Sequence, residues 1–196
     1  MLADYVVDTS RGEEDARAQV AAILKDVRSP EWRRPAKQAI KGMKKRNIVF
    51  DTETTGTSVF DDRVVEIACV ELDGFFPTGR TFQRYINPKR DIPAEVVAVH
   101  GLTADFLKDF PTFDDPEICD AFMEFVGDDG ILIAHNAEFD RGFLNAELSR
   151  LNRPPLMKDR FIDTLEMARK MFPGAPASLN ALCKRFSISL TGHGNL

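Results

Sequence analysis

The sequence lacks the features of a membrane, secreted or zinc-binding protein. It contains no apolar run near the length of a membrane span, and it does not begin with a basic segment followed by an apolar one. Its three cysteines, Cys69, Cys119 and Cys183, lie far apart in the chain. We therefore expect a cytoplasmic protein that does not bind membranes, with reduced core thiols and neither a disulfide framework nor a zinc site.

An excess of positive charge is missing as well. The 196 residues carry a net charge of −5, whereas contacts with phosphates usually require a basic face. The basic residues are unevenly distributed, and seven of them crowd into the segment 33–46. They are Arg33, Arg34, Lys37, Lys41, Lys44, Lys45 and Arg46. The net charge alone therefore excludes no partner.

The stretch from Ile48 to Gly56 holds two acids at the end of an expected strand. Ile48, Val49 and Phe50 predict a buried strand that runs into Asp51 and Glu53. Side chains two apart on a strand share a face, so these carboxylates lie roughly 6.6 Å apart along the backbone. They repel each other unless one is protonated or a cation lies between them. Oxygen ligands suit Mg²⁺ or Mn²⁺ better than zinc, and the alternative is a pair of ordinary strand-end residues facing water.

The chain then turns at Thr54-Thr55-Gly56. Glycine allows a tight turn, and the nearby hydroxyls and amides are able to receive a substrate oxygen.

The remaining segments predict an α/β fold with one core. Strands are expected at 63–72, 81–87, 130–134 and 161–163, with a hairpin turn at Asp73-Gly74. Helices are expected at 93–99, at 138–151, after residue 163 through Arg169, and at 178–186, and residues 102–126 carry helical patterns broken by Pro111 and Pro116. Hairpin-linked strands followed by strands separated by helices indicate a mixed sheet.

Residues 1–46 differ from the rest and predict a helical, basic N-terminal extension. The segment from Glu13 to Val27 has apolar residues at helical spacing, and Ser29-Pro30 ends it. Such an extension packs on the main domain, binds a partner or guides nucleic acid. The alternative is a solvated, partly ordered leader.

A second string, from Ile131 to Asp140, reads as a buried strand, a polar turn and the start of a helix. It places Asp140 near a helix N-terminus, where a carboxylate is favoured even without any catalytic role. Asn136 either hydrogen-bonds a substrate or caps this helix. Near the C-terminal end of the sequence, His193 has the side chain best suited to accept a proton from water at neutral pH.

The strings D-x-E-T-T-G at Asp51, H-N-A-x-F-D at His135 and the segment around His193 resemble the three motifs of the DEDDh 3′–5′ exonucleases. The resemblance implies an RNase H-like fold, a mixed five-stranded sheet flanked by helices. It also implies two Mg²⁺ or Mn²⁺ ions held by Asp51, Glu53 and Asp140, with His193 as general base. The family's last aspartate would fall beyond Leu196, so we expect the exonuclease domain, 47–196, to be incomplete at its C-terminal end.

The resemblance further implies a set of substrate-binding residues. For Glu66 the alternative is the polar face of a half-exposed strand, and for Phe139 it is the core. Asp163 is interpreted as a structural cap. The substrate-binding set comprises Thr54, Thr55, Gly56, Glu66, His100, His135, Asn136 and Phe139.

The function implied is removal of 5′-nucleoside monophosphates from single-stranded or frayed DNA 3′ ends, as in the replicative proofreading subunits of bacteria. Expected partners are a polymerase subunit and a sliding clamp. One alternative is a short-RNA exonuclease of the RNase T or oligoribonuclease type. Another is a non-catalytic scaffold or 3′-end-binding module that keeps the exonuclease fold.

Overall fold

The structure, a computed structural model, describes residues 46–188. These residues belong to two compact units, one from Met43 to Glu166 and one that contains the segment from Met167 onward. The predicted N-terminal extension, apart from Arg46, and the predicted general base His193 lie outside the described residues.

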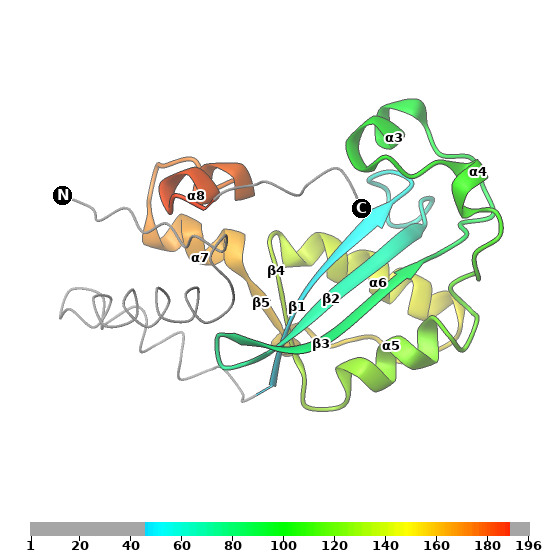
Figure 1. Cartoon of the computed structure of the whole chain (residues 1–196), viewed down its shortest axis with the longest axis horizontal. Coiled ribbons are helices and arrows are strands. Elements are labelled where there is room, and N and C mark those ends of the chain that lie inside the picture. Colours follow the sequence, from blue (N-terminus) through cyan, green and yellow to red (C-terminus); the bar gives the residue numbers. More distant parts are fainter. Residues whose placement is uncertain (1–45, 189–196) are drawn as a thin grey trace. The chain divides into compact units, whose positions relative to one another are not determined.

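The first unit is built on a five-stranded sheet with strand order β3-β2-β1-β4-β5 (Figure 1). Strand β1 pairs antiparallel with β2 and parallel with β4, while β2–β3 is antiparallel and β4–β5 parallel. This confirms the predicted mixed sheet. The strands are β1 (Arg46–Thr54), β2 (Val64–Asp73), β3 (Phe76–Tyr85), β4 (Ile131–Ala134) and β5 (Phe161–Asp163).

The returning strand of the hairpin begins earlier than the sequence predicted. Asp73 pairs with Phe76 across a two-residue loop, so β3 starts at Phe76 and not at Thr81. Pro77 lies inside this segment and hid it, because proline is unfavourable in a strand interior. The edge position of β3 makes proline tolerable there, since an edge strand pairs on one side only.

Helices follow the predicted order. They are α3 (Ala94–His100), α4 (Ala104–Leu107), α5 (Cys119–Val126), α6 (Ala137–Arg150), α7 (Thr164–Met171) and α8 (Leu179–Arg185), with a 3₁₀ turn at Lys158–Arg160. Helix α3 ends at Gly101, whose left-handed φ of 79° suits glycine. Within the described part of the chain, no helix is both long and apolar enough to cross a bilayer.

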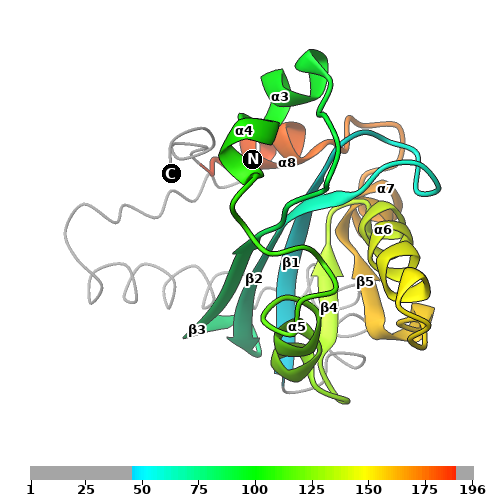
Figure 2. The same cartoon turned by 90° about the vertical axis from the view of Figure 1, so that its right-hand side faces the viewer.

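The alternation along β1 divides the sheet into two faces. Ile48 and Phe50 are buried in the main core, together with Phe122 of α5 and Phe143 of α6. Helices α5 and α6 lie on this face of the sheet, as Figure 2 shows. Val49, which lies between Ile48 and Phe50 on β1, is 41 % exposed. The opposite face therefore carries Asp51 and Glu53 at the carboxyl end of β1.

In the second unit, the described residues centre on two aromatic rings. Phe172 and Phe186 have ring centroids 6.0 Å apart, and the guanidinium of Arg185 lies 4.4 Å from the centroid of Phe172. Helix α8 begins at Ser178, whose side chain accepts a hydrogen bond from the amide of Ala181 at 3.3 Å. This is a helix cap of the usual kind.

Candidate active site

The carboxyl end of β1 brings two glutamates face to face. In the β1–β2 ladder Glu53 pairs directly with Glu66, and Asp51 pairs with Ala68. Gln83 on β3 donates to Glu66 Oε1 at 2.7 Å, which fixes that carboxylate. Like charges directly opposite each other in a sheet are destabilising, so this pairing costs stability in the absence of a cation.

Asp140, in the first turn of α6, reaches the same strand from the neighbouring element. It is 3 % exposed, and its Oδ1 accepts hydrogen bonds from Thr52 N at 3.1 Å and from Thr52 Oγ1 at 2.7 Å. These bonds tie the start of α6 to β1 between Asp51 and Glu53. The N-terminal position also favours a negative charge through the helix dipole.

The electrostatics of the site show that these acids act on one another. Burial raises the pKa of Glu53 to about 7, and the charges of Asp51, Glu66 and Asp140 add to the shift. Burial also raises the pKa of Asp140 to about 7; bonds from Thr52 oppose the shift, and the charge of Asp51 increases it. No ion pair among residues 46–188 involves Glu53 or Asp140. The site therefore concentrates negative charge that a bound cation would relieve.

The donors fit a hard divalent cation in kind. All are carboxylate oxygens, the ligands that Mg²⁺ and Mn²⁺ prefer, and Mg²⁺ usually keeps several waters and takes only one or two protein carboxylates. Within 46–188, however, no three His, Cys, Asp or Glu side chains are gathered closely enough to hold a metal ion between them. The structure thus brings Asp51, Glu53 and Asp140 to one end of the sheet without closing a three-ligand cage.

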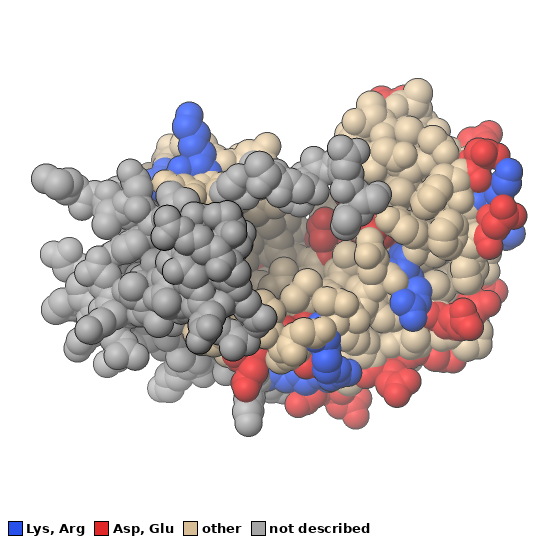
Figure 3. All heavy atoms as spheres, viewed as in Figure 1, with Lys and Arg blue, Asp and Glu red and all other residues tan. Residues whose placement is uncertain are grey.

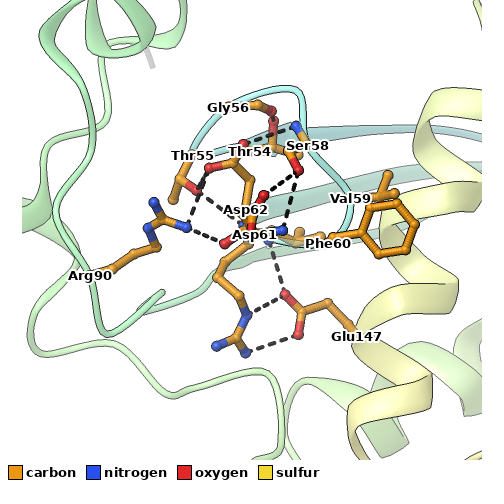
Figure 4. Close-up of polar contacts among 12 residues, drawn as sticks. Thr54, Thr55, Gly56, Ser58, Val59, Phe60, Asp61, Asp62, Arg90 and Glu147 are labelled. Atoms are coloured by element: carbon orange, nitrogen blue, oxygen red, sulfur yellow. Dashed lines mark hydrogen bonds and ion pairs between the residues drawn. The ribbon is translucent and has the colours of Figure 1, made fainter.

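The threonines of the turn after β1 are engaged inside their own loop, as Figure 4 shows. Thr54 Oγ1 donates to Gly56 O at 2.6 Å, and Thr55 Oγ1 donates to Asp62 Oδ1 at 2.9 Å. The amide of Thr55 donates to Arg63 O at 2.9 Å. In this structure both hydroxyl hydrogens are therefore used to hold the loop 55–63 together, and the substrate-binding roles of Thr54 and Thr55 stay predictions.

His100 approaches the end of β1 from helix α3. Its Nδ1 accepts a hydrogen bond from Leu102 N at 3.0 Å, and its Nε2 lies 3.3 Å from Thr54 O. An imidazole whose Nδ1 accepts carries its hydrogen on Nε2, which then donates to the carbonyl. Both ring nitrogens are thus used by the backbone, and the faces of the ring are what His100 has left to offer a substrate.

The turn between β4 and α6, together with the first turn of that helix, holds three more of the predicted residues. His135 Nδ1 lies 3.0 Å from Thr164 Oγ1. Asn136 occupies the N-cap position of α6 with a left-handed φ of 74°, but its side chain makes no capping bond, which contradicts the capping alternative. The left-handed backbone turns the side chain away from the position that a capping residue takes. Phe139 packs against the core, with its ring centroid 4.8 Å from that of Phe143, which supports the core alternative.

Asp163 is a structural cap, as predicted. Its Oδ1 accepts from Leu165 N at 2.8 Å and from Glu166 N at 3.3 Å at the start of α7. The same oxygen accepts from Asn136 N at 3.1 Å and so fixes the β4–α6 turn.

Sequence reasoning missed the buried Glu147. Its carboxylate accepts from Arg63 Nε at 2.7 Å, from Arg63 Nη2 at 2.9 Å and from Val64 N at 3.2 Å (Figure 4). The signal was present, because Glu147 falls within the apolar stripe of α6 formed by Phe143, Leu144 and Leu148. A charge in such a stripe requires a partner of opposite charge.

The described surface is rich in acids away from the site as well. On the face drawn in Figure 3, Asp and Glu side chains gather along the edge near α4 and down toward α5, where Lys and Arg are fewer. That edge is unsuited to a phosphate backbone.

Comparisons with known proteins identify the family of this chain. The sequence matches the exonuclease family RNase_T over residues 48–196. DNA polymerase III subunit epsilon of Rickettsia felis is 48 % identical over 158 residues, which are 77 % of this chain and 68 % of that protein. The epsilon subunit of Escherichia coli (strain K12) is 41 % identical over 162 residues, 77 % of this chain and 65 % of that one.

Solved structures show the same fold. Exonuclease X, in complex with 5′ overhanging duplex DNA, has a TM-score of 0.58 at 27 % identity and covers 76 % of this chain and 78 % of its own. A structure of exonuclease I has a TM-score of 0.63 at 19 % identity over 77 % of this chain and 38 % of that one. With its acids at the carboxyl end of β1, this chain belongs to the exonuclease family.

Proposed function

We propose that this chain is a metal-dependent 3′–5′ exonuclease that removes 5′-nucleoside monophosphates from DNA ends and proofreads for a replicative polymerase. The observation that carries the proposal is the group of mutually repelling carboxylates at the end of β1, in a chain whose relatives include epsilon subunits of DNA polymerase III. The exonuclease domain in this proposal spans residues 47–196, and the chain acts in the cytoplasm.

In the proposed site Asp51, Glu53 and Asp140 hold two Mg²⁺ or Mn²⁺ ions. When bound, such ions clamp the scissile phosphate and lower the pKa of a bound water. His193, which lies outside the described residues, accepts the proton of the attacking water in this proposal. Glu66 is fixed opposite Glu53 and borders the terminal nucleotide.

The loop 55–63 and His100 form the rest of the substrate pocket. The loop is held by its own threonines, so it offers a fixed wall to the terminal nucleotide. In this proposal His100 offers the face of its ring, and Asn136 offers a side-chain amide that makes no capping bond to α6. A frayed or mispaired end would enter such a pocket more readily, because melting it costs less free energy.

The partners proposed are a DNA 3′ end, the polymerase subunit and the sliding clamp. DNA is favoured over short RNA because the relatives reported above are subunits of a DNA polymerase. The experiment compares rates on single-stranded DNA, on a mispaired duplex end and on dinucleotide RNA, each with Mg²⁺ and with EDTA. Preference for RNA would overturn the substrate assignment.

The Asp51→Ala variant tests the site. We expect it to lose nuclease activity, and Asp73→Ala, an exposed acid at the far end of β2, to keep it. Full activity in Asp51→Ala, or none in the unaltered chain under any metal, would contradict the proposal; the second outcome would favour a non-catalytic module.

A further inference from the structure

The positive charge that a nucleic-acid strand requires is concentrated in the second unit. Residues 46–166 contain twice as many acidic residues as basic ones, and Figure 3 shows acids along the edge near α4 and α5. The segment 167–188, by contrast, contains four basic residues and no acidic one. The four are Arg169, Lys170, Lys184 and Arg185. Phosphates are bound by lysine and arginine, so this basic segment suits a polyanion and the acidic edge does not.

Two of these side chains are open to solvent. Arg169 on α7 and Lys184 on α8 are exposed. Neither takes part in any of the ion pairs found among residues 46–188. No carboxylate of this part of the chain therefore neutralises their charge, and an external anion is able to reach it.

Arg185 is held in another way, by an aromatic ring. Its guanidinium carbon lies over the ring of Phe172, 4.4 Å from the centroid, which is the geometry of a cation–π contact. The Nε of Arg185 is buried and has no hydrogen-bond partner in the described part of the chain. Buried donors are normally paired, so an orphaned one calls for an explanation. A guanidinium that is stacked, charged and short of acceptors is suited to bind a phosphate through its planar fork.

An aromatic ring lies open beside this arginine. Phe186 follows it directly in the chain, is 41 % exposed, and has its ring centroid 6.0 Å from that of Phe172. Proteins bind single strands by combining such rings, on which bases stack, with basic side chains that follow the backbone. An acidic peptide offers negative charge but no bases. The open ring therefore favours a single-stranded nucleic acid as the ligand.

We propose that Arg185 binds a phosphodiester group of single-stranded DNA, that Arg169 and Lys184 bind further phosphates, and that Phe186 stacks on a base. This rests on the proposed function, because the ligand is the strand whose 3′ end the chain would degrade. The surface adds strand binding to the proposed metal and terminal-nucleotide residues, which belong to the acidic first unit. The affinity for a strand should then depend on salt through the basic segment 167–188.

The first test measures binding of the full chain to a fluorescent oligothymidylate of about twelve nucleotides, by anisotropy at several salt concentrations. EDTA is present, so that no DNA is cut. Arg185→Gln should weaken binding about tenfold and reduce the slope of log affinity against log salt by about 0.7. The double variant Arg169→Gln/Lys184→Gln should reduce that slope by about 1.4. The control Arg153→Gln, which removes an arginine paired with Asp120 in the first unit, should change neither.

The second test separates stacking from charge. Phe186→Leu keeps an apolar side chain and removes the ring, so binding should weaken about tenfold with the salt slope unchanged. Polyglutamate of the same length is then added as a competitor to the unaltered chain. We expect it to displace the labelled strand far less well than unlabelled oligothymidylate does. Equal displacement would mean that the surface serves an acidic protein, and would overturn the proposal.

Melting temperatures show which variants fold. If Arg185→Gln does not, the double variant decides, because Arg169 and Lys184 are exposed. Unchanged affinity and unchanged salt slope in the folded variants of the basic segment overturn this inference even if the chain degrades DNA. A chain that binds the strand in the expected way but cleaves nothing when Mg²⁺ is supplied retains this inference and loses the proposed function.

Discussion

The first unit contains two groups of buried or half-buried acids whose surroundings are opposite in charge. Glu147 is 1 % exposed and binds Arg63 through both carboxylate oxygens, with Arg150 3.3 Å away. Glu71 is bound by Arg46 at 2.6 Å and Arg80 at 2.9 Å. Glu53 and Asp140, at the end of β1, receive neither arginine nor lysine among the described ion pairs, and they have acids for neighbours.

The pKa values follow from this difference. Burial alone would raise the pKa of Glu71, but hydrogen bonds from Arg46 and Thr78 and the charges of Arg46 and Arg80 lower it. Burial raises the pKa of Asp140 to about 7, and the charge of Asp51 works in the same direction. Acids paired with arginine stabilise the fold without any ligand. Acids left beside one another store repulsion that an external cation relieves, which is what a metal-dependent site needs.

The largest effect we expect is on activity, in Asp140→Asn. The asparagine oxygen still accepts both bonds from Thr52, so the fold should be kept. Loss of the charge removes about 4 kcal/mol of metal-assisted stabilisation of the transition state, or about 1,000-fold in kcat/KM. Cleavage of single-stranded DNA, with the melting temperature measured alongside, tests this. If Asp140→Asn unfolds, or if it cleaves DNA normally, the claim that Asp140 serves the metal site and not the stability of the fold is wrong.

The matched change among the acids paired with arginine is Glu147→Gln. We expect it to lower the stability of the fold and to leave the activity of the folded molecules near normal. The amide nitrogen cannot accept the second bond from Arg63, and the guanidinium is left without its counter-charge. We expect a loss of about 3 kcal/mol in the free energy of unfolding, since removing one partner of a buried pair is costly. Urea denaturation measures it. Activity per folded molecule should stay near normal; a 1,000-fold loss would mean that Glu147 belongs to the site.

The pH dependence of stability gives the next effect, on the order of 2 kcal/mol. The raised pKa values of Glu53 and Asp140 mean that the folded state holds protons more tightly than the unfolded chain does. The stabilisation of the folded state that these two groups give through their bound protons is therefore complete below about pH 4, and it is lost as the pH rises through about 7. Without metal, stability should fall across this interval, and saturating Mg²⁺ should reverse the fall. Thermal melts at several pH values, with EDTA and with Mg²⁺, decide whether it does.

Much of this arrangement could be predicted from sequence, and the limits have physical causes. Because side chains alternate along a strand, the sequence predicts that Asp51 and Glu53 share one face of β1, and the burial pattern of β1 agrees. The position of Asp163 just before a helix predicts a cap, and its carboxylate accepts a hydrogen bond from Leu165 N. Periodicity does not show which hydroxyls are already used. The bonds of the Thr55 hydroxyl depend on Asp62 and Arg63, which the loop 55–63 brings back to it.

The start of helix α6 at Asn136 is a second case in which a partner distant in the sequence determines the local geometry. Asparagine is a common cap, yet here a left-handed backbone is held by Asp163, which lies 27 residues further along the chain. Partners so distant leave no local pattern. The pairing of Glu147 with Arg63 is of the same kind, and only its position in an apolar stripe hinted at it.

The smallest effect concerns the loop 55–63, which follows β1 and its acids along the chain. A Cβ at Gly56 would lie 2.3 Å from Asp62 Oδ2, and its φ is not in the left-handed region, so the cost of Gly56→Ala is one of contact. The Asp62 carboxylate has little freedom to yield, because Thr55 Oγ1 and Ser58 N bind it at 2.9 Å each and Arg90 lies 3.4 Å away. We expect a loss of about 1–2 kcal/mol.

Gly142→Ala is the control, because it lies in helix α6, where alanine is favoured by about 1 kcal/mol and the new Cβ would meet only Val59 at 3.2 Å. Its melting temperature should stay close to normal or rise, while that of Gly56→Ala falls. If Gly56→Ala also lowers activity in proportion to the folded fraction alone, the loop stabilises the fold without shaping the site. A larger loss of activity would show that the wall formed by loop 55–63 positions the DNA end beside the carboxylates.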